Sequence, residues 1–132
     1  MPWSWQYVCT AGPPKLDAML VRIWRTHIEE ARAPEYEAFA QQRSLPMFQT
    51  QQGFAGVLFA REGASCAVIS FWRDAAAVDA LASSASYRET ATALADTGML
   101  VGEASVEVFE LRGGLLEDAP LPRDAAGVEP CC

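Results

Sequence analysis

The chain has 132 residues, of which 51% are hydrophobic and 20% are charged, and its net charge is −7 at pH 7. This composition is typical of one globular domain and excludes a disordered or fibrous protein. Binding to the phosphates of DNA or RNA needs clustered Lys and Arg, and here Lys15 is the only lysine. We therefore expect neither nucleic acid nor an anionic membrane surface as a partner.

Targeting and metal-binding signals are also missing from the sequence. No stretch reaches the ~20 apolar residues of a membrane span, and the N-terminus does not resemble a signal peptide, so we expect a cytoplasmic protein. Cys9, Cys66, Cys131 and Cys132 are spaced neither as a zinc site nor as a disulfide framework. With His27 as the only histidine, no metal site is predicted.

The two ends of the chain differ from its middle. Residues 1–18 show no sustained period and predict an irregular arm, although Trp3, Trp5 and Tyr7 alternate with polar residues and leave a short strand open. Residues 113–132 begin with two glycines and also lack a period, which predicts a flexible tail. The folded domain is therefore expected over residues 19–112.

The first half of this domain predicts a strand followed by a helix. Residues 19–27 are rich in β-branched and aromatic side chains, which favour a strand. Residues 29–43 place apolar side chains at steps of three and four, which is the period of an amphipathic helix. We expect Pro46 to end or kink this helix and residues 47–53 to form a connecting turn.

The second half predicts a hairpin, a helix and a last strand. Residues 54–61 and 65–73 are strand-like runs joined by a short Gly-containing turn, which favours an antiparallel hairpin. Asp74 is placed to cap a helix that we expect to kink near residues 83–86. Residues 104–111 alternate apolar and polar side chains as the last strand.

This order of elements is that of the ferredoxin-like α+β fold, a four-stranded antiparallel sheet with the helices on one face. Strand alternation sorts the side chains into two sets. The purely apolar set is expected to lie under the helices and contains Val21, Ile23, Ala67, Ile69, Phe71, Val106 and Val108. The other set mixes aromatic and polar residues and contains Arg22, Trp24, Thr26, Ser70, Trp72, Glu107 and Phe109. We expect a second copy of the chain to cover this mixed face and to enclose a cavity there.

Several segments resemble a known family: MLVRIWRTHIEE in the first strand, PMFQTQQGFAGVLF before the second, AVISFWRD at the end of the third and SVEVFEL in the last. Over residues 19–112 the chain is similar to the antibiotic biosynthesis monooxygenase-like domains of the dimeric α/β-barrel superfamily. The resemblance implies a homodimer and oxidation of a small quinol-like or polyketide-like aromatic compound by O₂ without a cofactor. Family members that oxidise polyketides or degrade heme use a pocket asparagine, and this chain contains no Asn.

The predicted site combines an apolar slot with groups that could handle a phenolic proton or oxyanion. The candidate catalytic residues are His27, Trp72 and Arg22. The candidate substrate-binding residues are Trp24, Ser70, Phe109, Tyr36 and Phe48, with Arg43, Tyr87 and Arg88 beside Tyr36 at a cavity mouth.

Each candidate also has a structural interpretation. Arg22 can pair with Glu107, because the first and last strands are neighbours in this fold and both residues belong to the mixed set. His27 can lie on the surface, and the tryptophans can simply pack at an interface. Two other functions stay open for the whole protein: a non-catalytic dimer that binds a hydrophobic small molecule, and a heme-binding or heme-degrading protein that uses His27.

Overall fold

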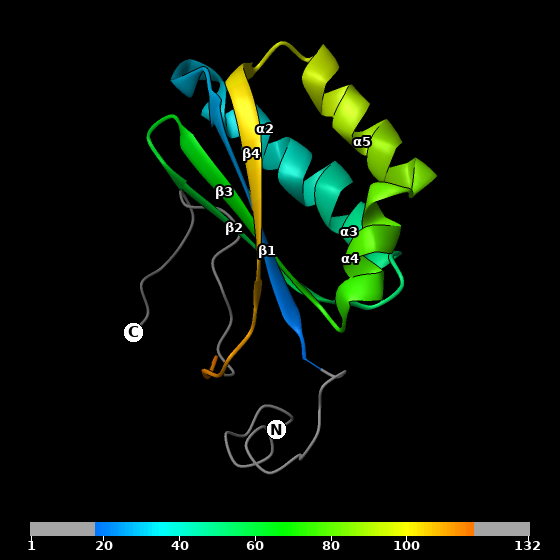
Figure 1. The fold of residues 1–132 in the computed structure, drawn as a ribbon. Helices are drawn as coiled ribbons and strands as arrows, with labels where there is room; N and C mark the ends of the chain where they lie inside the picture. The colour runs from blue at the N-terminus through cyan, green and yellow to red at the C-terminus, as the bar shows by residue number, and fades with distance from the viewer. Residues whose placement is uncertain (1–17, 118–132) are drawn as a thin grey trace. The chain divides into compact units, whose positions relative to one another are not determined.

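Four strands form one antiparallel sheet in the computed structural model, which describes residues 18–117. They are β1 (Leu20–Ile28), β2 (Phe54–Glu62), β3 (Ser65–Trp72) and β4 (Leu100–Glu110). The order across the sheet is β2-β3-β1-β4, so β3 and β1 are the central strands (Figure 1). The predicted antiparallel sheet and the hairpin between β2 and β3 are confirmed.

One helical segment connects β1 to β2, and it is longer than predicted. It consists of the 3₁₀ turn η2 (Glu30–Arg32), α2 (Ala33–Phe39), the π-helix η3 (Ala40–Ser44) and α3 (Leu45–Gln49). The expectation that Pro46 ends the helix is wrong, because α3 continues to Gln49, and the alternative of a kink stays a prediction. Pro46 has no N–H and its ring crowds the preceding turn, and the wider π turn before it lets the helix continue.

Two helices connect β3 to β4. They are α4 (Ala75–Ala82) and α5 (Ala85–Asp96), and the predicted kink is a full break between them. The Asp74 carboxylate accepts a hydrogen bond from the Ala77 N–H at 2.9 Å, as predicted for a cap. The Ser84 hydroxyl accepts one from the Tyr87 N–H at 3.2 Å and starts α5 in the same way.

All of these helices cover one face of the sheet (Figure 1). The predicted assignment of side chains to the two faces is wrong for β1 and β3, because their mixed-set residues lie under the helices, whereas Val106 and Val108 of β4 lie under the helices as expected. Arg22 and Thr26 are buried on β1, and Cys66, Val68, Ser70 and Trp72 are buried on β3. The apolar residues Val21, Ile23, Ala67, Ile69 and Phe71 point to the face that none of the helices within residues 18–117 covers, and they are only half-buried.

The register of β4 corrects a second expectation. Val106 and Val108 lie opposite Trp24 and Arg22, while Glu107 and Phe109 lie opposite Ile23 and Val21. Directly paired residues share a face, so Glu107 and Arg22 are on different sides of the sheet. The predicted Arg22–Glu107 ion pair is therefore wrong, and Glu107 pairs with Arg25 instead.

The terminal predictions are largely outside the described residues. These are the arm over residues 1–18 with its optional strand at Trp3, Trp5 and Tyr7, and the cysteines Cys9, Cys131 and Cys132. Of the tail predicted from residue 113, residues 113–117 contain no helix or strand. Within residues 18–117, no helix is both long enough and apolar enough to cross a membrane.

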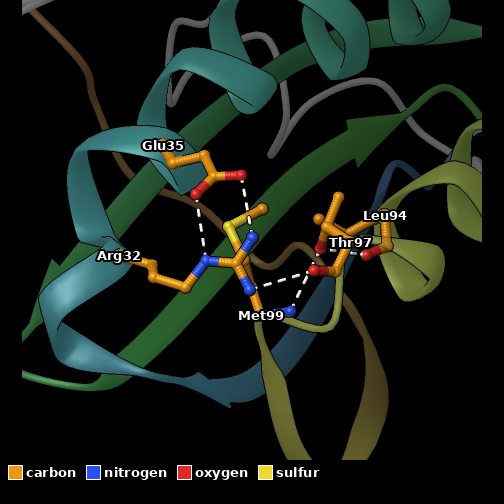
Figure 2. A network of polar contacts seen from close by, with 5 residues as sticks. All are labelled: Arg32, Glu35, Leu94, Thr97 and Met99. Carbon is orange, nitrogen blue, oxygen red and sulfur yellow. Dashed lines mark hydrogen bonds and ion pairs between the residues drawn. The ribbon is translucent and has the colours of Figure 1, made fainter.

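A polar network fixes the start of α2 to the end of α5 (Figure 2). The Arg32 guanidinium donates two hydrogen bonds to the Glu35 carboxylate, at 2.9 and 3.0 Å, and a third to the Thr97 carbonyl at 2.9 Å. The Thr97 hydroxyl donates to the Leu94 carbonyl and accepts from the Met99 N–H. This network holds together the two helices that flank the cavity described below.

The Arg32–Glu35 contact predicts a pH dependence of stability. The hydrogen bond and the charge of Arg32 lower the pKa of Glu35, so its stabilising contribution is fully present above the unfolded-state pKa of about 4.3 and is lost as the pH falls through the lower, folded-state pKa. We expect Glu35→Gln to unfold at lower urea concentration than the wild type at pH 7, with a gap that closes toward pH 3.

The control for this experiment is Glu103→Gln. Glu103 is exposed on β4 and forms no ion pair with another described residue. Its substitution should produce no comparable pH-dependent gap. A gap for Glu35→Gln that stays constant from pH 7 to pH 3 would contradict the assigned role of the carboxylate.

Gly53 permits the close approach of β2 to α4. Its φ is +82°, and a Cβ atom added there would lie 2.4 Å from the Ala77 Cβ. Its carbonyl also accepts a hydrogen bond from the Arg73 N–H at 2.9 Å, so the segment cannot easily move away. Gly102 has a similar φ of +75° but open space around it.

The two glycines allow backbone strain and steric clash to be separated. Alanine at either position incurs the left-handed backbone penalty of about 1–2 kcal/mol. We expect Gly53→Ala to lose a further ~1–3 kcal/mol through overpacking against α4. Urea unfolding at one fixed protein concentration measures the difference, and equal losses for Gly53→Ala and Gly102→Ala would contradict the close contact.

Candidate functional site

A partly enclosed cavity of about 90 Å³ lies between the sheet and the helices. Strands β1, β2 and β3 form its floor, and the π-helix η3, α2, α3 and α5 contribute to its walls. Most of its lining is apolar, and six aromatic residues contribute to it: Trp24, Tyr36, Phe39, Phe48, Phe59 and Tyr87. Such a surface suits a flat, apolar ligand.

Trp24 is the central residue of this cavity. It packs against two separate groups of buried residues, one around Tyr36 and Leu94 and the other around Phe48 and Trp72. Its position on the central strand β1 places the ring between these groups, at the cavity floor. Aromatic rings held in this way present a rigid face to a ligand.

Arg22 supplies the main charge in the cavity wall. Its side chain comes from β1, the residue is only 9% exposed, and its Nη2 donates a hydrogen bond to the Tyr87 hydroxyl at 2.9 Å. The guanidinium carbon is 5.5 Å from the centre of the Tyr87 ring. Within residues 18–117, no carboxylate forms an ion pair with Arg22.

A buried hydrogen-bond chain supports Arg22 from behind. The Trp72 Nε1–H donates to the Ser70 hydroxyl at 2.9 Å, and that hydroxyl donates to the Arg22 carbonyl at 3.4 Å. Trp72 and Ser70 are both fully buried, and the Trp72 ring packs edge-on against Phe54. These residues therefore position Arg22 and do not line the cavity themselves.

Tyr36 is the second tyrosine of the lining, and it is buried. Burial raises the pKa of its hydroxyl, and the neighbouring Cys66 thiol raises it further. Burial also raises the pKa of Cys66. Both groups are therefore neutral at pH 7, so neither supplies a carboxylate-like base to the cavity.

The structure brings some of the predicted site residues together and separates others. Arg22, Trp24, Tyr36 and Phe48 surround the cavity, and Ser70 and Trp72 lie directly behind its wall.

His27 and Phe109 share the uncovered face of the sheet with Val21, on the opposite side from the cavity, because the inward-facing residues of β1 are Arg22, Trp24 and Thr26. His27 is exposed there and cannot ligate a heme placed in this cavity.

Sequence reasoning placed Tyr87 at a cavity mouth but did not connect it to Arg22. It also missed Phe39, Phe59 and the inward residues of α5. A signal was present for α5, because Tyr87, Thr90, Ala91 and Leu94 follow the three-and-four spacing of one helix face, and all four line the cavity. The partnership with Arg22 spans 65 residues and has no local signal.

No group of three or more His, Cys, Asp or Glu side chains that could hold a metal ion occurs in the described part of the chain. The polar residues on the cavity wall are Arg22, Tyr36, Ser44, Tyr87 and Thr90. Their hydroxyl and guanidinium groups can orient an oxygen-bearing ligand by hydrogen bonds. Hydroxyl and guanidinium groups are not a typical ligand set for a redox metal.

The fold is similar to that of several solved structures. No family model and no curated protein matches the sequence. Among solved structures, SnoaB, a cofactor-independent oxygenase from Streptomyces nogalater, is 24% identical with a TM-score of 0.62, and the match covers 76% of this chain and 99% of SnoaB. A proposed antibiotic biosynthesis monooxygenase from Caulobacter crescentus is 13% identical with a TM-score of 0.62, covering 73% of this chain and 92% of that protein.

A third match has a similar extent. A proposed antibiotic biosynthesis monooxygenase from Nitrosomonas europaea is 9% identical with a TM-score of 0.61, and the match covers 74% of this chain and 94% of that protein. At these identities the likeness concerns the fold and not the chemistry. The chain thus has the ferredoxin-like α+β fold of the antibiotic biosynthesis monooxygenase-like domains.

Proposed function

We propose that this protein binds a small phenolic or quinol-like aromatic compound in the cavity between sheet and helices and oxidises it with O₂ without a cofactor. One observation carries the proposal: an aromatic-lined cavity has a single charged end, formed by Arg22 and its hydrogen-bonded partner Tyr87. The fold shared with SnoaB, which is described as a cofactor-independent oxygenase, supports the same chemistry.

The geometry suggests how the residues would act. Trp24 and Phe48 hold the ring, and the Arg22 and Tyr87 donors bind its oxygen, which favours loss of the phenolic proton to solvent. The electron-rich phenolate is then the reductant for O₂. In the balanced reaction a phenol with a free ring position becomes a quinone: one oxygen atom enters the ring, the C–H and O–H hydrogens leave, and water is formed.

A non-catalytic binding protein is the second candidate, and a specific observation favours it. The cavity wall contains no carboxylate and no imidazole among the described residues, and burial keeps Tyr36 protonated. A binder needs only the apolar slot and the donors, whereas an oxygenase needs the ligand itself to lose a proton. Oxygen consumption separates the two functions.

The oxygenase proposal predicts cavity-dependent O₂ uptake. With a panel of single-ring and two-ring hydroquinones, we expect purified protein to consume O₂ above the buffer rate with at least one compound in the presence of a metal chelator. Ala91→Phe fills a cavity-lining position and should lower this uptake by roughly tenfold or more. Ligand binding, seen as quenching of tryptophan fluorescence without O₂ uptake, would identify a binding protein.

The matched control is Thr92→Phe. Thr92 is the next residue on α5, is exposed and does not line the cavity. The same aromatic side chain there should leave O₂ uptake unchanged. If Ala91→Phe and Thr92→Phe behave alike, the reaction does not take place in this cavity.

We further propose that two copies of the chain pair through the face of the sheet that the helices leave uncovered. The neighbouring side chains on this face are largely apolar and half-buried: Leu58, Ile69 and Ile23 form one row across the sheet, and Phe71, Val21 and Phe109 form the next. Phe109 is 50% exposed. An apolar sheet face of this extent is rarely left open to water.

This proposal predicts that one charge on the face disrupts the dimer. Ile69→Glu, at the centre of the face, should convert the protein from dimer to monomer in analytical ultracentrifugation, because burying an unpaired carboxylate is strongly unfavourable. Thr92→Glu adds the same charge on the helical side and should leave the dimer intact. A wild-type monomer at micromolar concentration would contradict the proposal.

A further inference from the structure

We infer that the cavity binds its ligand as an oxyanion carried on a single aromatic ring, with the negative oxygen beside the Arg22 guanidinium and the Tyr87 hydroxyl. The inference rests on the proposed function, because it concerns the ligand of the same cavity. It adds two properties of that ligand, its charge and its size.

The charge follows from the surroundings of Arg22. The residue is 9% exposed, and its guanidinium lines an otherwise mostly apolar cavity. The ion pairs of the described residues involve Arg25, Arg32, Arg61 and Arg112, and none involves Arg22. A buried cation without a counter-charge is costly unless an anion or several hydrogen bonds compensate it. A bound anion would supply the missing charge.

The other polar groups of the wall point to the same ligand charge. Tyr36, Ser44, Tyr87 and Thr90 carry hydroxyl groups, and no carboxylate lines the cavity among the described residues. Desolvation of Tyr36 keeps its hydroxyl neutral. The wall therefore offers a positive charge and hydrogen-bond donors, and it lacks the anionic acceptor that a cationic ligand needs.

Arg22 and Tyr87 form a relay of donors. The Tyr87 oxygen accepts the Arg22 N–H at 2.9 Å, so the Tyr87 proton is available to another acceptor. Accepting a hydrogen bond from a cation makes the hydroxyl a stronger donor. The Ser84 hydroxyl caps the first turn of α5 by accepting a hydrogen bond from the Tyr87 N–H. The hydrogen bonds from Trp72 to Ser70 and from Ser70 to the Arg22 carbonyl hold the Arg22 backbone. The two donors are thus held in place before a ligand arrives.

The size follows from the volume of the cavity. An apolar cavity of about 150 Å³ is enough to hold benzene, and this cavity measures about 90 Å³. One ring already requires the walls to move slightly, and its polar substituent occupies the Arg22 end. Two fused rings would overpack Trp24 and Phe48 or leave one ring outside.

The first experiment tests the charge with the full-length protein and isothermal titration calorimetry. Benzoate should bind roughly 10- to 100-fold more tightly than benzamide, its neutral isostere. 4-Nitrophenol tests a phenolate in place of a carboxylate, because only its ionised form is yellow. Below the pKa of the free compound, adding protein should increase the yellow absorption. Equal affinities for benzoate and benzamide, or no binding of any probe, would overturn the inference.

Variants assign the charge preference to Arg22. Arg22→Gln should reduce the affinity for benzoate to that for benzamide and leave benzamide binding within roughly twofold. Tyr87→Phe keeps the ring and removes one donor, and it should lower benzoate binding by roughly threefold to tenfold. Tyr87→Phe tests the role of the two donors if Arg22→Gln does not fold. Arg25→Gln lies on the same strand but on the opposite face and should change nothing.

A last arm tests the size. 2-Naphthoate should bind roughly tenfold or more weakly than benzoate, and equal or tighter binding would overturn the restriction to one ring. The outcome is separable from that of the proposed function. Anion-selective binding without O₂ uptake contradicts only the oxygenase proposal, whereas O₂ uptake with neutral and two-ring compounds alone contradicts only this inference.

Discussion

The position of the Arg22 side chain constrains the rest of the candidate site. A guanidinium on the central strand β1 lies under the helices with Tyr87 as its hydrogen-bond partner and without a carboxylate among the described residues. Hydrogen bonds to a charged group are worth about 1.5–3 kcal/mol, so Tyr87 only partly offsets the cost of burial. The neighbouring cavity lets a ligand or water complete the solvation of the charge. The relation between Arg22, Tyr87 and the cavity is thus a direct consequence of placing a cation in the interior.

The two faces of the sheet have different chemistry, and this difference organises the molecule. The helix-covered face contains Arg22, Thr26, Ser70 and two tryptophans, and its polar atoms are mostly bonded to one another. The Thr26 hydroxyl is the exception, since it is buried without a partner among the described residues. The uncovered face is apolar where Val21 and Ile23 pair with Phe71 and Ile69, and it becomes polar toward Arg25 and His27. We interpret the first face as the ligand-binding side and the second as the side that pairs with another copy of the chain.

Local features of the fold could be predicted from the sequence, and the facing of the central strands β1 and β3 could not. The Asp74 cap, the break near Ser84 and the β2–β3 hairpin each depend on a few adjacent residues. Strand alternation correctly separated the residues of β1 and β3 into two sets, but it does not say which set points inward. The more apolar set was expected to point inward. On β1 and β3 the inward face instead carries polar residues that line or support the cavity. In β4 the register with β1 places Phe109 and Glu107 on the same face as Val21 and Ile23, and this pairing joins strands that are far apart in the sequence, so no local signal sets it.

The most direct test of this account is to locate the bound ligand by NMR. In a ¹H–¹⁵N titration with 4-nitrophenolate, we expect the Trp24 indole N–H, the Arg22 Nε–H and the backbone amides of residues 87–94 to shift together as the ligand saturates the site. The signals of Arg25, His27 and Phe109 on the uncovered face should stay in place. Shifts concentrated on Arg25, His27 and Phe109, with Arg22 and Trp24 unchanged, would contradict the assignment of the site to the cavity under the helices.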